Sequence, residues 1–205
     1  MSKRPSANAF LEPNLLFLIF AGISLGTVLI AQPFRMALLW LTLLVLSLLY
    51  RSRQPVDVGF DLARVGRGAL LGLVIAVPLF AFLAGPLRVF MERLYATKDA
   101  MLLFYQVCFV AAPVEGYFFR GIVQPRMGSS AGIALYAVTA LLFFLPYVPI
   151  LASFIAFVAM GVLGIIYSYV REHYGLAASV ACHVVIGFIV QVLPSLVETV
   201  RMMLA

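Results

Sequence analysis

Charged residues are scarce in this sequence: they make up 11% of its 205 residues, whereas ordinary soluble domains carry about 25%. Hydrophobic residues account for 64%, and the mean hydropathy is +1.11. This composition excludes an ordinary soluble domain and indicates a polytopic membrane protein. Because helices satisfy their own backbone hydrogen bonds in lipid, we expect an all-α transmembrane helical bundle.

Cysteine and histidine are also rare, with two of each. Cys108 and Cys182 both fall inside predicted spans, so they do not indicate a disulfide framework. His173 falls in a predicted loop, and the sequence has no His-Glu-x-x-His pattern. We therefore expect no metal and no other cofactor.

Sustained internal repeats and low-complexity linkers are absent as well. We expect one membrane domain over residues 1–205, with N-terminal spans and loops at 14–99 and a core at 100–198.

Seven apolar runs come close to the roughly 20 residues that cross a hydrocarbon core about 30 Å thick. The first is too long for the apolar region of a signal peptide and lacks a small-residue cleavage site, so we expect an uncleaved transmembrane helix. Residues 54–67 are expected to be an amphipathic interfacial segment, and residues 86–99 an amphipathic loop or short helix on the opposite side. Pro78 is expected to kink the third span. The predicted spans are 14–31, 34–50, 68–85, 100–124, 129–147, 150–170 and 176–197.

The chain is basic, with a net charge of +6 and a pI of about 9.6. Its basic residues cluster at the ends of apolar runs, where they orient membrane proteins, so nucleic-acid binding is not expected. Seven alternating spans place nine of the fourteen basic residues on the side of the N-terminus. We therefore expect a cytoplasmic N-terminus, an outside C-terminus and insertion in the cell (inner) membrane. The nine residues are Lys3, Arg4, Arg51, Arg53, Arg64, Arg67, Arg120, Arg126 and Arg171.

Few ionisable residues fall within the predicted hydrocarbon, where an unpaired charge costs several kcal/mol: Glu115, Arg120 and His183. At a rise of about 1.5 Å per residue, Glu115 lies roughly 16 Å from Arg126, and His183 lies roughly 14 Å from Tyr174. Both reference residues belong to loops on the same side. We therefore expect Glu115 and His183 to lie at similar depth and to face one aqueous cavity.

Glu115 and Arg120 are five positions apart, which on a regular helix separates their directions by about 140°. They need not form a local ion pair. Pro113, Gly116 and Gly121 weaken the helix in the same region, so a bend there could alter that angle.

The segment Glu115-Gly116-Tyr117-Phe118-Phe119-Arg120-Gly121 resembles the Glu-Glu-x-x-x-Arg-Gly signature of the CAAX-protease and bacteriocin-processing family of glutamic intramembrane endopeptidases. Residues 157–167 are similar to that family's small-residue helix. Gly175-Leu176 followed by Ala181-Cys182-His183 resembles its last motif, His-x-x-x-Asn/Asp. The resemblance extends over about residues 100–192.

This resemblance implies an endopeptidase that cleaves a membrane-associated protein or peptide, with membrane lipid as its surroundings. Glu115 would be the general base that activates water, and His183 would be an oxyanion donor or proton shuttle. Arg120 would be a structural or electrostatic partner. Phe143 and Tyr147 correspond to the family's second motif, Phe-x-x-x-His, and would be auxiliary residues.

The chain departs from the family pattern at three positions. Gly116 stands where the first motif has its second Glu, Tyr147 where the second motif has His, and Gly187 where the last motif has Asn or Asp. Two alternatives therefore stay open: a non-catalytic membrane scaffold or binding protein that kept the cavity, and a proton-coupled carrier that uses the buried acid and histidine.

Overall fold

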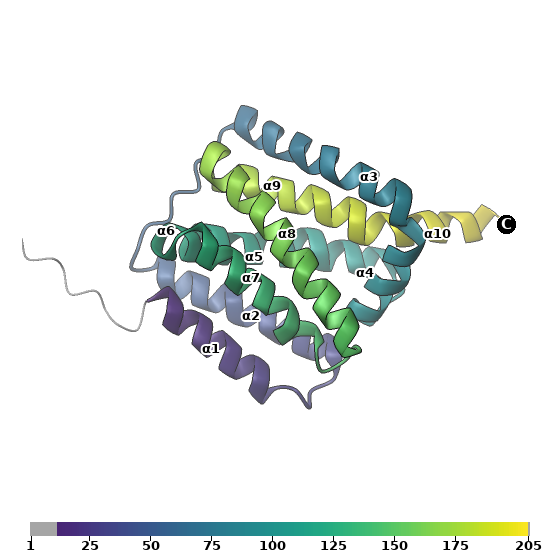
Figure 1. Cartoon of the computed structure of the whole chain (residues 1–205), viewed down its shortest axis with the longest axis horizontal. Coiled ribbons are helices and arrows are strands. Elements are labelled where there is room, and N and C mark those ends of the chain that lie inside the picture. Colours follow the sequence, from purple (N-terminus) through teal and green to yellow (C-terminus); the bar gives the residue numbers. More distant parts are fainter. Residues whose placement is uncertain (1–11, 205) are drawn as a thin grey trace, which may run out of the picture.

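A computed structural model describes residues 12–204, and within that range every regular element is a helix (Figure 1). Lys3 and Arg4, which belong to the predicted basic side, lie outside the described residues. Three segments are π-helical and are labelled η. In chain order the elements are α1 (Pro13–Gly26), α2 (Gln32–Arg51), α3 (Leu62–Tyr95), α4 (Ala100–Phe104), η2 (Tyr105–Ala111), α5 (Ala112–Glu115), η3 (Gly116–Val123), α6 (Gln124–Met127), α7 (Ser129–Phe144), α8 (Ile150–Tyr174), α9 (Leu176–Gly187), η4 (Phe188–Val192) and α10 (Leu193–Leu204).

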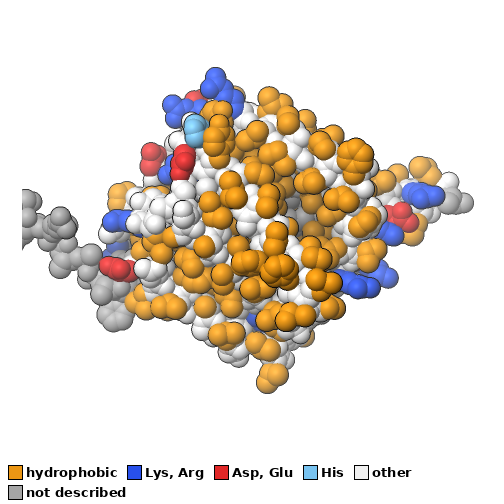
Figure 2. Space-filling view, in the orientation of Figure 1, with side chains coloured by type: hydrophobic (Ala, Val, Ile, Leu, Met, Phe, Trp, Pro, Cys, Tyr) orange, Lys and Arg blue, Asp and Glu red, His pale blue; other side chains and the backbone are white. Residues whose placement is uncertain are grey.

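Five helical stretches are long and apolar enough to cross a membrane, and α1 and α7 are shorter apolar helices. The long ones are α2, α3, the continuous run Ala100–Met127, α8 and the continuous run Leu176–Leu204. Orange apolar side chains cover most of the visible surface in Figure 2, and the charged side chains gather towards two of its edges. The predicted all-α polytopic bundle is confirmed.

Helix α3 is longer than the predicted third span of 68–85. The Asp61 side chain accepts a hydrogen bond from the backbone N–H of Ala63 at 3.1 Å, so the helix begins early, inside the segment expected to lie in the interface. It continues through Pro78 and Pro86 to Tyr95, and Figure 1 shows it bending towards its C-terminal end. The prediction of a separate element at 86–99 is therefore wrong.

The last turns of α3 stay helical because their apolar side chains are buried while their charged ones face outwards. Met91, Leu94 and Tyr95 are buried, and Arg93 is exposed. The side chain of Gln32 also donates a hydrogen bond to the carbonyl of Leu94 at 2.7 Å, which satisfies a helix-terminal acceptor. An amphipathic pattern thus extends a span rather than forming a loop.

Small residues bring α3 against α9, and the two helices lie side by side in Figure 1. Gly68, Gly72 and Ala76 recur at every fourth position and are buried. A Cβ atom at Gly68 would lie 2.2 Å from the carbonyl oxygen of Ala178, and one at Gly72 would lie 2.9 Å from that of Cys182. In lipid the hydrophobic effect does not drive helices together. Close van der Waals packing of the two backbones therefore stabilises the contact between α3 and α9.

Arg35 is fully buried near the start of α2 and joins the ends of the two short helices. Its Nη1 donates to the carbonyl of Phe143 at 2.8 Å, and its Nη2 donates to the carbonyl of Leu142 at 2.6 Å. The same Nη2 donates to the carbonyl of Ser24 at 2.9 Å. The guanidinium therefore satisfies C-terminal carbonyls of α7 and α1 together, where a cation is also favoured by the helix dipoles.

Substitution of Gly68 by Ala should destabilise the bundle by about 1–3 kcal/mol, because α3 and α9 must move apart. Gly66→Ala is the matched control, since its Cβ would meet nothing within 4 Å and alanine favours the helix by about 0.5–1 kcal/mol. Both can be measured as the midpoint of thermal labelling of the buried Cys108 and Cys182 by a thiol-reactive dye. Equal midpoints for the two variants would contradict the close contact.

Candidate active site

A cavity of about 540 Å³ lies inside the bundle, and both Glu115 and His183 line it. Its walls are mainly apolar and come from α2, α3, η2, α5, α7, α8, α9 and η4. Figure 2 shows the surface hollowed in the region where α3 and α8 diverge in Figure 1. The side chains with polar atoms on the cavity wall are Trp40, Tyr95, Glu115, Tyr136, His183 and Gln191.

Glu115 ends the short α5 helix and is buried. The indole N–H of Trp40 on α2 donates to its Oε1 atom at 3.0 Å. Trp40 is in turn packed on Phe143 and Tyr95, with ring centroids 5.8 and 6.2 Å away. A donor on a fixed aromatic ring thus sets the direction of the carboxyl group.

The helix around Glu115 is irregular, because π-helical η2 precedes α5 and η3 follows it. The i→i+5 hydrogen bonds of η3 give more residues per turn than in an α-helix. The angle of about 140° expected between Glu115 and Arg120 on a regular helix therefore does not apply. Such π-turns are frequent at functional sites. Here they re-aim the side chains on either side of Glu115.

His183 lies on α9 and is held by two tyrosines. Its Nε2 is 3.2 Å from the hydroxyl oxygen of Tyr136 on α7. Its ring is stacked on Tyr167 of α8, with centroids 4.4 Å apart and planes 24° apart. These contacts fix the plane of the imidazole at the cavity wall.

Arg120 lies behind these rings and does not line the cavity. Its guanidinium carbon is 4.5 Å from the centroid of Tyr136 and 5.7 Å from that of Tyr167. Gly164 on α8 makes room, since a Cβ there would lie 3.3 Å from Tyr136 and 3.5 Å from Nη2 of Arg120. Arg120 is only 1% exposed, so the cation–π contacts are made in a desolvated place.

The second-motif residues separate in space. Phe143 is buried and lines the cavity, whereas Tyr147 lies in the turn between α7 and α8, outside the cavity wall. The hydroxyl of Tyr147 donates to the carbonyl of Ile30. The structure therefore brings Phe143 to Glu115 and His183, but not Tyr147.

Both glycines that depart from the family pattern, Gly116 and Gly187, lie at tight helix contacts. A Cβ atom at Gly116 would lie 2.9 Å from Cγ2 of Val180 on α9. One at Gly187 would lie 2.7 Å from Cγ1 of Val107 on η2. A carboxylate at the first position or an amide at the second would not fit without a shift of the neighbouring side chain.

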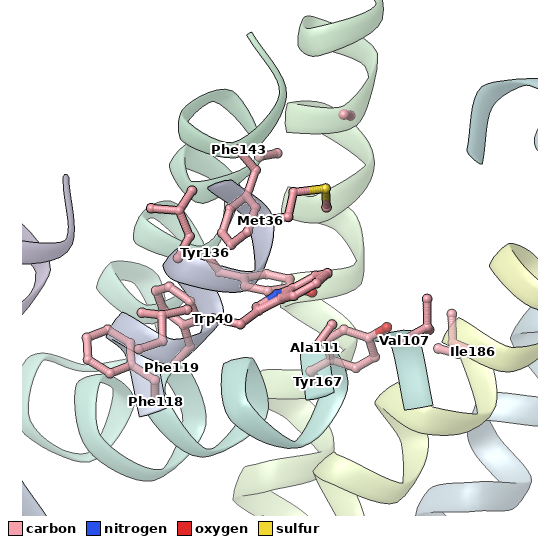
Figure 3. Packing of buried hydrophobic residues seen from close by; sticks show 14 of the residues in the cluster. Met36, Trp40, Val107, Ala111, Phe118, Phe119, Tyr136, Phe143, Tyr167 and Ile186 are labelled. Atoms are coloured by element: carbon pink, nitrogen blue, oxygen red, sulfur yellow. The ribbon is translucent and has the colours of Figure 1, made fainter. Parts of the chain in front are cut away.

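Sequence reasoning did not identify Trp40, Tyr136 and Tyr167 as site residues. One signal was present: each is an aromatic residue with a polar tip in the middle of an apolar run, and such a tip needs a partner when it is buried. Figure 3 shows Trp40 near Phe143, and Tyr136 near Phe119, in this buried cluster.

Among residues 12–204, no three His, Cys, Asp or Glu side chains are grouped so as to hold a metal. The groups that are present are a carboxyl, an imidazole, two phenols, a carboxamide and an indole N–H around an apolar space. This set is capable of proton transfer and hydrogen bonding to a carbonyl oxygen.

Residues 97–189 match the family model described as "Rce1-like: Type II CAAX prenyl endopeptidase Rce1-like". The match confirms the expected resemblance over this segment, which is similar to a family of membrane proteases. No curated protein and no solved structure matches the chain. The apolar helices support an integral membrane protein, and residues 97–189 of it resemble a protease family.

The single tryptophan offers a direct test of the bond to Glu115. Glu115→Leu removes the acceptor, so the emission maximum of Trp40 should move to shorter wavelength, because an indole N–H bonded to an oxygen emits at longer wavelength. Glu115→Gln keeps an acceptor oxygen and should shift the emission less. Glu198→Gln, outside the cavity wall, is the matched control and should emit like the wild type. Unchanged emission in Glu115→Leu would rule out the contact.

Proposed function

We propose that this protein is an intramembrane glutamic endopeptidase that cleaves a membrane-associated protein or peptide. One observation carries the proposal: Glu115 and His183 line a single apolar cavity within a segment that matches a protease family. By the description of that family, peptides with a prenylated C-terminus are one class of substrate to test.

Glu115 is the general base of the proposed reaction. Its carboxylate takes a proton from a water molecule, and the oxygen of that water attacks the carbonyl carbon of the scissile peptide bond. Trp40 holds the carboxyl group through Oε1, which leaves the other oxygen for the water. When the tetrahedral intermediate collapses, the C–N bond breaks and the proton passes from Glu115 to the leaving nitrogen.

His183 contributes hydrogen bonding to the reacting carbonyl or to the leaving group. In the tautomer in which the Tyr136 hydroxyl donates to Nε2, Nδ1 carries the proton and is the remaining donor of the ring. Arg120 is a positioning residue, because it contacts the rings of Tyr136 and Tyr167 and not the cavity.

The cavity is open to lipid between α3 and α8. Leu83 on α3, and Ile155 and Val162 on α8, line it and are also 43%, 52% and 54% exposed. An apolar substrate segment could therefore reach the site sideways from the bilayer, without passing the charged ends of the helices.

We further propose that the end of the bundle where α1 begins faces the cytoplasm of a cell with this protein in its inner membrane. The described basic residues are more numerous at that end than at the other. Apart from the buried Arg35 and Arg120, they are Arg51, Arg53, Arg64, Arg67, Arg126 and Arg171, against Arg88, Arg93, Lys98 and Arg201.

A second candidate is a non-catalytic binding protein that uses the same cavity. Gly116 and Gly187 favour it, because a Cβ atom at either position would strike a valine side chain, so the carboxylate and amide of the family pattern would require that side chain to shift. Such a protein would bind the same apolar segments but release them intact.

Hydrolysis can be measured with the purified full-length protein in detergent micelles. The probes are a quenched fluorescent peptide with a farnesylated CAAX end and a pool of quenched single-span membrane peptides. Glu115→Gln should lower the cleavage rate by about 10²–10⁴-fold, because the general base is lost. His183→Ala should also lower it strongly, and Glu198→Gln should leave it unchanged.

Thermal labelling of the buried cysteines shows whether each variant is folded. Cleavage by a folded Glu115→Gln variant at the wild-type rate would disprove the proposed mechanism. Binding of the probes without cleavage, seen as quenching of Trp40, would instead support the binding protein.

A further inference from the structure

Gln191 presents a carboxamide to the same cavity as Glu115 and His183. It lies in η4, the π-helical segment that follows α9. The hydroxyl of Tyr95 on α3 donates to its Oε1 at 2.7 Å. Tyr95 is itself buried and stacked on Trp40, with an angle of 23° between the rings.

The bond from Tyr95 fixes which end of the amide is used. Because Oε1 already accepts a hydrogen bond, the Nε2 group with its two hydrogens is the free end. No hydrogen bond within residues 12–204 involves this Nε2 atom. A donor directed by a rigid neighbour into an apolar space calls for an acceptor on the molecule that fills that space.

The absence of a side chain at Gly187 leaves room beside this amide. Nε2 of Gln191 is 4.0 Å from the position that a Cβ atom at Gly187 would take. Gly187 is four residues after His183 on α9, and Gln191 is four residues further on. The amide nitrogen thus comes back along the helix towards the turn that carries His183.

We propose that Gln191 is the residue whose Nε2–H donates to a carbonyl oxygen of the substrate, and that Tyr95 is its positioning residue. This inference rests on the proposed function for its catalytic consequence: the carbonyl oxygen becomes negatively charged when water attacks, and the amide stabilises that charge. Fixed donors aimed at such an oxygen are worth about 10²–10³-fold in kcat.

The first experiment measures binding of carbonyl groups and does not need hydrolysis. Dodecanamide brominated on its chain and bromododecane are titrated into the full-length protein in micelles, and binding is read from quenching of Trp40. The wild type should bind the amide more tightly than the alkane by about two- to tenfold, as for one hydrogen bond. Gln191→Leu should bind the two probes equally.

The second experiment measures hydrolysis of whichever quenched peptide probe the wild type cleaves. Gln191→Leu should lower kcat by about 10²–10³-fold with little change in KM, since the lost interaction forms mainly in the transition state. Tyr95→Phe keeps the stacked ring but releases the amide, so it should lower kcat less. A purely structural role would not separate kcat from KM in this way.

A rescue variant sharpens the test. In the Gln191→Leu background, Gly187→Asn combined with Val107→Ala places a carboxamide one turn earlier and removes the side chain that it would strike. Recovery of part of the lost kcat, and of the preference for the amide probe, is expected.

The two proposals fail in different ways. If the wild type cleaves peptide and folded Gln191→Leu cleaves it with the same kcat, the role of Gln191 is wrong while the endopeptidase stands. If the wild type cleaves nothing, the proposed function fails, and the binding experiment still decides about Gln191. An amide preference that persists in Gln191→Leu, or is absent from the wild type, would overturn the donor assignment.

Discussion

A carboxyl group inside hydrocarbon has to find its hydrogen-bond donors on neighbouring helices, and Glu115 finds one in Trp40 of α2. Trp40 and Tyr95 both lie outside the segment 97–189 that matches the protease family. Helices α2 and α3 are therefore part of the candidate site and not an appendage to it. They supply the donor to Glu115, the support for Gln191 and, through α3, one wall of the opening to lipid.

The buried guanidinium of Arg120 is stabilised by aromatic rings and not by a carboxylate. Arg120 has no carboxylate salt bridge among the described residues, and its charge lies against the electron-rich faces of Tyr136 and Tyr167. The same two rings hold His183 by a hydrogen bond and by stacking. One cation thus organises two aromatic residues that in turn orient the imidazole. The arrangement links η3, α7, α8 and α9 without bringing a second negative charge near Glu115.

The sequence predicts how deep a residue lies along a helix. Glu115 and His183 were expected at equal depth because the rise per residue is constant, and they line one cavity. The sequence does not predict the directions of side chains around a helix axis or their hydrogen-bond partners on other helices. The turn geometry of η3 depends on packing rather than on a local motif, so the angle between Glu115 and Arg120 was not predictable. Tyr147 fits the family spacing, yet it lies after the end of α7, where the chain turns towards α8. The predicted span of 68–85 is shorter than α3, because the charged residues at both ends of this helix resemble loops when burial is not known.

Arg35 has a consequence for the surrounding lipid. The two helices that end at this buried cation have 14 and 16 residues. At 1.5 Å per residue they are about 21 and about 24 Å long, shorter than a hydrocarbon core of about 30 Å. A bilayer that becomes thinner next to α1 and α7 would match them, and it would draw headgroups and water inwards on that side of the protein. If the protein is the proposed endopeptidase, which consumes water inside a membrane, this local compression would shorten the distance over which each water molecule has to travel.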